Sequence, residues 1–216
     1  MKSASNKQQA LILRGGTTTL DQDLLDLGLK SHGHKCPAMP MGLRAGVAAM
    51  HALGVERAPD GQLVALVEID EDHCATCFAD GVQVATGCTF GKGNIRRLGY
   101  GKSGLTLIDK RTQRAVRVVP KGSVMMKNRE SEFMKLRSSG TPASQIPAEL
   151  VDPLIANVSA APDEAILDVG EVTAYEWHDT QHTFEAFLCP ECGEMVVERN
   201  ARVKGGVAVC RPCAER

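Results

Sequence analysis

The sequence predicts an α+β fold followed by a separate four-cysteine module. A short, nearly continuous apolar run over Leu63–Ile69 is typical of a buried strand. Two more apolar stretches, Gly104–Lys110 and Arg114–Val119, flank a short polar turn and predict a hairpin, which argues against a wholly parallel sheet. Helical patterns lie on both sides of these strands, and two Cys-x-x-Cys pairs follow residue 188.

The length of 216 residues suits one ordinary domain and a small appendage, which we place at residues 1–186 and 187–216. The composition, 43% hydrophobic and 24% charged, is typical of a soluble globular protein. No apolar run approaches the roughly 20 residues that span a bilayer, so we expect no membrane segment. The polar start, Met1–Gln9, is not followed by a signal-type apolar segment, and we therefore expect a cytoplasmic protein.

The first helices are expected around a cluster of histidine and cysteine residues. One begins near Thr19, with acidic residues in its first turn, and should end near Gly28. The next covers Met41–Leu53 and is stopped by a glycine. A third covers Cys77–Ala85, and the many glycines of 87–104 predict a loop.

Helices also follow the hairpin. Arg129–Arg137 and Ala143–Val158 have helical patterns, and Pro147 and Pro153 are expected to break the second one. Ala165–Trp177 reads as a less regular strand.

The net charge of −1 conceals a strong asymmetry along the chain. Residues 92–137 contain 13 Lys and Arg against three acids, whereas residues 138–188 contain nine acids and no Lys or Arg. We favour solvated faces and mutual pairing within the fold or a dimer. The alternative is a basic surface for an anionic cofactor, an acidic partner or nucleic acid. Only Tyr100 and Phe133 are aromatic in the basic stretch, which argues against nucleic acid.

The C-terminal cysteines have the spacing of a structural zinc site. Two Cys-x-x-Cys pairs are separated by 17 residues, and their members are Cys189, Cys192, Cys210 and Cys213. Met195–Glu198 and Gly206–Val209 are expected to form a hairpin between the pairs. Because about 25 residues hold too little core, bound Zn²⁺ would supply the folding energy. A redox or disulfide role is the alternative.

A second group of candidate ligands lies at His32, His34 and Cys36. These side chains alternate along the chain, and Pro37 prevents a helix from running through them. This pattern indicates a metal or reactive-thiol site. Cys77, at a predicted helix start where thiolates are favoured, is the best further member of the group.

Three neighbouring residues are less clearly placed. Cys88 lies eleven residues after Cys77, roughly 16 Å along a continuous helix, and cannot share its ion unless the helix breaks; it is as well explained as a small packed residue. The roles of His73 and Cys74, which precede Cys77, stay open.

Two glycine-rich stretches resemble nucleotide-binding loops only superficially. Gly99–Gly104 matches G-x-G-x-x-G, but it precedes a strand and not a helix. Gly87–Lys92 is one residue short of a phosphate loop, and Gly93 stands where the hydroxyl residue belongs. Lys92 and the loop amides could still bind an anion or a cofactor phosphate.

Taken together, these motifs resemble the FmdE family, which is named after a component of formylmethanofuran dehydrogenase. The segments that carry the resemblance are His32-Gly-His-Lys-Cys-Pro37, Gly42-Leu-Arg44, Cys77-Phe-Ala-Asp-Gly-Val-Gln83 and Thr86-Gly-Cys-Thr-Phe-Gly-Lys-Gly-Asn94. The C-terminal cysteines match the zinc-finger appendage of some members. The resemblance implies a mixed β-sheet flanked by helices, a treble-clef or zinc-ribbon module, and a homodimer.

The resemblance also implies a site built from five side chains, which are His32, His34, Cys36, Cys77 and Asp80. His34, Cys36 and Cys77 would be ligands of a second metal ion of unspecified identity, with His32 beside them or bound to the ion. A fourth position would be left for water or substrate. Cys36, Cys77 and Asp80 are then the candidate catalytic residues, and Asp80 could orient an imidazole or accept a proton.

Three hypotheses for function follow from these residues. The first is a metal-binding accessory protein of a molybdenum- or tungsten-dependent redox enzyme, formylmethanofuran dehydrogenase being the example. The second is a stand-alone zinc- or cysteine-dependent enzyme acting on a small molecule. The third is a zinc finger that binds nucleic acid or protein. The sequence leaves open whether the chain is itself an enzyme.

Overall fold

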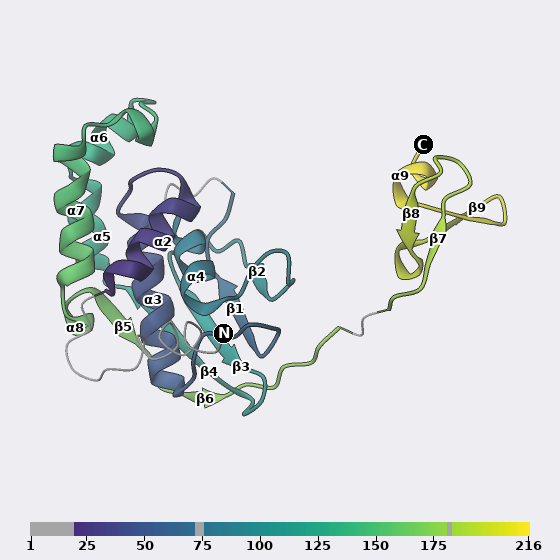
Figure 1. Ribbon diagram of the computed structural model, residues 1–216, viewed down its shortest axis with the longest axis horizontal. Coiled ribbons are helices and arrows are strands. Elements are labelled where there is room, and N and C mark those ends of the chain that lie inside the picture. The colour runs from purple at the N-terminus through teal and green to yellow at the C-terminus, as the bar shows by residue number, and fades with distance from the viewer. Residues whose placement is uncertain (1–19, 72–75, 181–182) are drawn as a thin grey trace, which may run out of the picture. The chain divides into compact units, whose positions relative to one another are not determined.

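The computed structural model describes residues 20–71, 76–180 and 183–216. The polar start, His73 and Cys74 lie outside the described residues. The chain divides after Trp177 into two compact units. The first is a mixed sheet packed against helices, and the second contains two small hairpins and a short helix (Figure 1). The predicted α+β fold class is confirmed. Within the described part, no helix has the length and apolar character needed to cross a membrane.

The sheet of the first unit has the order β2-β1-β3-β4-β5, with β6 also paired to β4. The predicted hairpin is present as β3 (Leu105–Asp109) and β4 (Arg114–Pro120). The predicted buried strand is β1 (Leu63–Val67), which pairs antiparallel with β3 and parallel with β2. The remaining strands are β2 (Ile95–Arg97), β5 (Leu167–Val169) and β6 (Thr173–Ala174). β2 lies inside the segment expected to be entirely loop.

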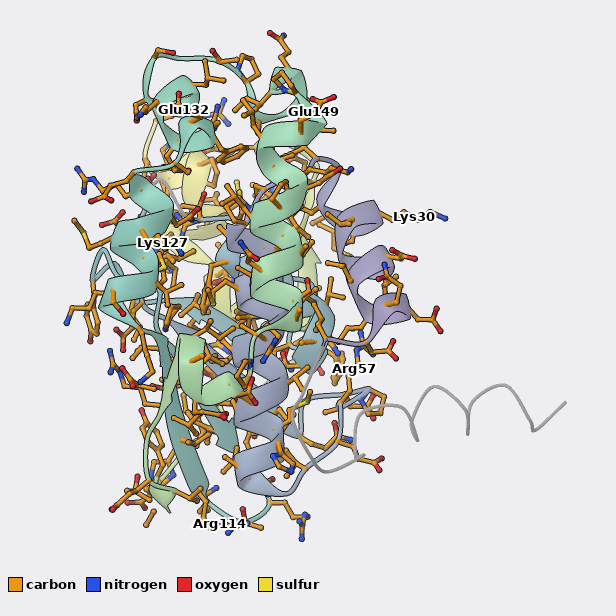
Figure 2. The ribbon with its side chains drawn as sticks, turned by 90° about the vertical axis from the view of Figure 1, so that its left-hand side faces the viewer. Lys30, Arg57, Arg114, Lys127, Glu132 and Glu149 are labelled. Carbon is orange, nitrogen blue, oxygen red and sulfur yellow. The ribbon has the colours of Figure 1, made fainter. Side chains whose placement is uncertain are left out.

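Helices pack on one face of this sheet, with α3 (Ala38–Leu53) against β3, β4, α4 and α7. The others are α2 (Gln22–His32), α4 (Phe78–Thr86), α5 (Gly122–Arg129), α6 (Glu132–Ser138), η1 (Ala143–Gln145), α7 (Ala148–Ala160) and α8 (Asp163–Ile166). Their outer surfaces carry charged side chains such as Lys30, Lys127 and Glu149, which point into solvent (Figure 2).

Two helix boundaries differ from the sequence prediction. α2 continues past Gly28 to His32, because Gly28 is a packing residue: a Cβ there would lie 2.9 Å from Met39 Sδ. The helix is instead ended by Gly33, whose φ of 89° is left-handed. α7 is not broken at Pro153, which lies inside it, and Pro147 serves as its N-cap. The stretch predicted as a strand from Ala165 is largely α8 and the short strands β5 and β6.

The packing of α3 on α4 is unusually close because glycines stand at the contact. A Cβ on Gly42 would lie 2.0 Å from the carbonyl oxygen of Phe78, and one on Gly81 would lie 2.1 Å from that of Met39. One turn further along α3, a Cβ on Gly46 would lie 2.7 Å from that of Ala85. The two helix backbones therefore touch directly, and this fixes the start of α4 relative to the start of α3.

Arg44, on the same helix, is 1% exposed and fully engaged. Its guanidinium donates to the carbonyls of Val158 and Ser159, both at 3.0 Å, and to Asp163 Oδ1 at 2.5 Å. These carbonyls belong to the last turn of α7, where backbone acceptors lack intrahelical donors. Arg44 therefore joins α3 to α7 and serves the fold.

The opposite face of the sheet has a second, smaller cluster of buried side chains, namely Val64, Leu66, Ile108 and Ala115, with Leu98, Tyr175 and Trp177 packed against it. Arg96 lies over the Trp177 ring at 4.5 Å from its centroid. Lys121 pairs with Asp168 at 2.6 Å. These two contacts link the basic stretch to the acidic one, as mutual pairing within the fold requires.

On that face, Glu68 is 5% exposed and accepts two hydrogen bonds from Arg117, at 2.6 and 2.8 Å. Gly104 makes room for the carboxylate, because a Cβ there would lie 2.6 Å from Glu68 Cδ. The Arg117 hydrogen bonds hold the pKa of Glu68 below its ordinary value, against the opposing effect of burial.

We expect Glu68→Gln to lower the free energy of unfolding by about 2 kcal/mol at pH 7, since a charge-assisted pair is lost. A lowered folded-state pKa contributes stability above the unfolded pKa of about 4.3, and that contribution disappears as pH falls through the folded pKa. The difference between variant and wild type should therefore shrink on acidification below about pH 4. Urea unfolding at pH 7 and pH 3 measures both values.

Glu132→Gln is the matched control, because its Lys135 partner is also solvent-exposed and such pairs contribute less than about 1 kcal/mol. A difference between Glu68→Gln and wild type that stays constant with pH would contradict the role given to Glu68.

The second unit consists of β7 (Ala186–Leu188), β8 (Met195–Val197), η2 (Glu198–Asn200), β9 (Arg202–Lys204), β10 (Val207–Val209) and α9 (Arg211–Ala214). The predicted hairpin between the cysteine pairs is wrong in its pairing: β8 pairs with β7, and β10 with β9. The first cysteine pair is itself the turn of the β7–β8 hairpin, where the Gly193 amide donates to the Cys189 carbonyl at 2.8 Å. Gly205 and Gly206, both with positive φ, make the second turn.

Candidate metal centre

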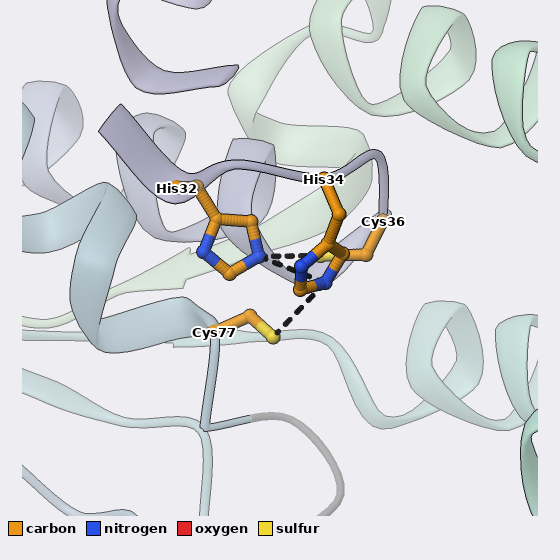
Figure 3. A group of neighbouring side chains, drawn as sticks. All are labelled: His32, His34, Cys36 and Cys77. Atoms are coloured by element: carbon orange, nitrogen blue, oxygen red, sulfur yellow. Dashed lines mark hydrogen bonds between the residues drawn. The ribbon is translucent and has the colours of Figure 1, made fainter. Parts of the chain in front are cut away.

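The N-terminal site is assembled from the ends of three helices (Figure 3). His32 is the last residue of α2, and the left-handed Gly33 turns the chain so that His34 returns toward it. Cys36 immediately precedes Pro37, the N-cap of α3. Cys77 is the N-cap of α4. The glycine contact between α3 and α4 brings the two cysteines together.

Their donor atoms converge closely. The Nε2 atoms of His32 and His34 are 3.1 Å apart, Cys36 Sγ is 3.5 Å from His32 Nε2, and Cys77 Sγ is 3.9 Å from His34 Nε2. All four donors lie within 4.8 Å of one another. Zn–N and Zn–S distances of about 2.0–2.1 and 2.3 Å place the donors of a tetrahedral ion roughly 3.3–3.8 Å apart. The side chains present therefore fit a tetrahedral metal ion.

Asp80 lies behind His32 and not among the donors. Its Oδ2 is 2.7 Å from His32 Nδ1, the ring nitrogen that faces away from the cluster. The His32 side chain is 5% exposed, whereas that of Asp80 is 46% exposed. The Asp80 hydrogen bond raises the pKa of His32 to about 9, outweighing desolvation of the ring. A carboxylate in this position holds Nδ1 protonated and leaves Nε2 for a metal.

The two thiols differ in acidity because they share a proton. A hydrogen bond from Cys36, reinforced by His32, lowers the pKa of Cys77 to about 4. The pKa of Cys36 is raised by the same hydrogen bond and by burial. Without a metal, the favoured state is a Cys77 thiolate beside a protonated His32. Metal binding at Nε2 would release that proton, so binding and proton release are coupled.

Two residues named from the sequence lie outside this cluster. Cys88 is fully buried in the main core, after the end of α4. The Lys92 ammonium donates to the carbonyls of Ala58 and Pro59, at 3.4 and 3.1 Å. The neighbouring loop amides donate to acceptors of the protein itself, which is not the arrangement expected of an anion-binding loop; they are those of Cys88, Thr89, Phe90, Lys92 and Gly93.

One residue of the site was not singled out from the sequence. Gln83 lies one turn after Asp80 on α4 and donates from Nε2 to Asp80 Oδ1 at 3.2 Å. The i, i+3 spacing of the two residues on a predicted helix was the available signal.

The four C-terminal cysteines also bring their sulfurs within 4.8 Å of one another. Cys192 and Cys210 are 3.8 Å apart at Sγ, close to the roughly 3.8 Å edge of a tetrahedral Zn–S₄ site. The Cys210 amide donates to Cys189 Sγ at 3.3 Å, and this lowers the pKa of Cys189 to about 6. The group is compatible with a zinc ribbon and fits a thiophilic ion such as Zn²⁺.

Comparison with known proteins gives three matches. A family model described as "FmdE, Molybdenum formylmethanofuran dehydrogenase operon" matches residues 31–168. A protein of Archaeoglobus fulgidus named "Probable S-adenosyl-L-methionine-binding protein" is 32% identical over 196 residues, which are 85% of this chain and 50% of that protein. The chain thus spans about half the length of this curated relative.

The third match is a crystal structure of a tungsten formylmethanofuran dehydrogenase FmdE-like protein from Syntrophus aciditrophicus. It is 21% identical, with a TM-score of 0.56, and the alignment covers 93% of this chain and 96% of that one. At this identity the likeness concerns the fold, and it agrees with the mixed sheet and flanking helices described above.

Proposed function

Because the chain belongs to the FmdE family, we propose that it is a metal-binding accessory protein of a molybdenum- or tungsten-dependent redox enzyme. The observation that carries the metal-binding part is the convergence of His32, His34, Cys36 and Cys77 on one tetrahedral position. The accessory role rests on the family alone. The C-terminal cysteines would hold a second ion, Zn²⁺.

The geometry supports His32 as the fourth ligand, in place of the open position expected from the sequence. Its Nε2 is as close to the other donors as a shared ion requires, and Asp80 fixes its orientation. An ion with four protein ligands has no free site and stabilises structure. Two thiolates and two imidazoles suit Zn²⁺, and they also suit other late transition metals.

Metal content gives the first test. We expect about two ions per chain in protein purified without chelator, and about one per chain in Cys36→Ser, since a hydroxyl is a poor substitute for a thiolate ligand. Elemental analysis by mass spectrometry measures both numbers. Cys88→Ala, which alters a buried cysteine outside both groups, should retain two ions. A wild type with one ion, unchanged in Cys36→Ser, would disprove the N-terminal site.

That last outcome would favour a second candidate, a cysteine-dependent enzyme. Asp80, His32 and Cys36 form a continuous series of contacts, at 2.7 Å from carboxylate to imidazole and 3.5 Å from imidazole to sulfur. A nucleophile, a base and a group that orients the base have this arrangement. In that case Cys77 would be alkylated rapidly by iodoacetamide even in protein carrying a full C-terminal site.

The partner gives the second test of the accessory role. Affinity purification of the full chain from its own cells should retain components of a molybdenum or tungsten enzyme, and their absence would leave metal binding without that role. A homodimer is checked by sedimentation of the same material. The name of the Archaeoglobus relative concerns a protein twice as long, and no described group of this chain independently supports S-adenosylmethionine binding.

A further inference from the structure

A chain of hydrogen bonds leads from the metal centre to a surface loop. His32 Nδ1 contacts Asp80 Oδ2 at 2.7 Å, and the other carboxylate oxygen, Oδ1, accepts from Gln83 Nε2 at 3.2 Å. The amide oxygen of Gln83 accepts in turn from the backbone N–H of Phe90 at 3.1 Å. An imidazole, a carboxylate, a side-chain amide and a backbone amide are thus joined in series.

The direction of the Gln83 amide in this series is determined by its neighbours. A backbone N–H can only donate, and an ionised carboxylate can only accept. Gln83 must therefore present its oxygen to Phe90 and its nitrogen to Asp80. Because both of its ends are used, the amide holds the Asp80 carboxylate in the rotamer that meets His32.

The loop end of the series is itself held rigidly. Asn94, 5% exposed, accepts from the Thr89 amide at 2.9 Å and donates to the carbonyl of Leu63 at 3.0 Å, which ties the loop to β1. Lys92 adds the bonds to the 58 and 59 carbonyls described above. The Phe90 amide is consequently a fixed donor, although the Phe90 residue is 90% exposed.

We propose that Gln83 is the positioning residue of the N-terminal metal centre, through which the 87–94 loop orients Asp80 and thereby His32. This inference rests on the proposed metal-binding function. It assigns a purpose to the Thr86–Asn94 segment other than anion binding: the segment supplies one fixed N–H to the site. The role of Gln83 is distinct from ligation, since it touches none of the four donors in the contacts described.

Cadmium provides a test that reports each site separately. The full chain is loaded with ¹¹³Cd²⁺, and its NMR spectrum should show one resonance for the Cys₄ site and a second for the His₂Cys₂ site. In Gln83→Leu, which keeps the size but loses both hydrogen bonds, we expect only the second resonance to shift or broaden. Affinity of that site should fall about tenfold, the lower end of the range for groups behind a ligand, and Asp80→Asn should cost more.

Three further measurements make the result specific. Gln83→Glu can still accept from Phe90 but cannot donate to Asp80, and it should weaken binding at least as much as Gln83→Leu. Phe90→Ala retains the backbone N–H and should behave as wild type. Long-range ¹H–¹⁵N spectra should show His32 protonated at Nδ1 in the wild type and a mixture of tautomers in Gln83→Leu.

The outcomes separate the two proposals. If the wild type shows the Cys₄ resonance alone, the metal-binding function fails. If both resonances appear and Gln83→Leu leaves the second one, its affinity and the His32 tautomer unchanged, the role of Gln83 is overturned. The unshifted Cys₄ resonance shows in every sample that the protein is loaded, and thermal unfolding of the first unit shows that it is folded.

Discussion

Gly42→Ala should destabilise the first unit by about 3 kcal/mol or more, a large effect for one methyl group. The added Cβ would lie 2.0 Å from the Phe78 carbonyl oxygen, so α3 and α4 must separate. A backbone atom is the obstacle, and no side-chain rotamer change can relieve the clash. Since the same contact brings Cys36 to Cys77, metal at the N-terminal site should be bound more weakly as well. Urea unfolding and metal titration measure the two effects.

Two other glycines make this prediction specific. Gly122→Ala, at the start of α5, has no heavy atom within 4 Å of the new Cβ and should be neutral or slightly stabilising. Gly46→Ala meets the Ala85 side chain at 2.7 Å, so Ala85→Gly should partly rescue it. No such rescue exists for Gly42→Ala. Wild-type stability of Gly42→Ala would mean that the helices are not in backbone contact.

Removal of metal should unfold the second unit completely while the first stays folded. Its buried core contains Val209 and the cysteines Cys189, Cys210 and Cys213, which is too little to fold without an ion. Binding of a structural Zn²⁺ contributes about 10–16 kcal/mol in comparable small modules, and most of it is folding free energy. With a strong chelator, the amide signals of residues 186–214 should collapse to unfolded positions in a ¹H–¹⁵N spectrum.

Cys192→Ser separates ligation from packing in this experiment. Cys192 is the exposed member of the four, so its replacement removes a ligand and leaves the small core intact. We expect the same collapse as with chelator, and restoration of the wild-type spectrum on adding Zn²⁺ to the wild-type protein alone. A second unit that stays dispersed without metal would show that the cysteines are not its source of stability.

Sequence reasoning predicted the parts of the fold that depend on local pattern. The apolar run of β1 and the β3–β4 hairpin are of this kind, because alternation and turn residues are read within a few positions. β2 was missed because three residues between glycines carry no pattern, and its parallel partner is distant in sequence. Gly28 was taken as a helix end because a glycine that caps and a glycine that packs look alike in sequence.

The candidate site shows the same limit. Residue types and spacing led to the His32–Cys36 cluster and to Cys77, since both follow from local chemistry. The bond from Gln83 to the Phe90 amide could not be predicted, because it depends on a seven-residue turn whose shape is set by Asn94 and β1. The burial of Arg44 was equally invisible, because its acceptors are carbonyls more than a hundred positions away.

The ligands of the N-terminal centre come from two segments roughly 40 residues apart, and an ion bound to both would act as a crosslink. By the chain-entropy estimate used for disulfides, closing a loop of that length removes about 4 kcal/mol of disorder from the unfolded chain. α2 and the start of α4 would then separate only after the ion leaves. For this unit, the concentration of free metal would set the rate of local opening, even though the core folds around other residues.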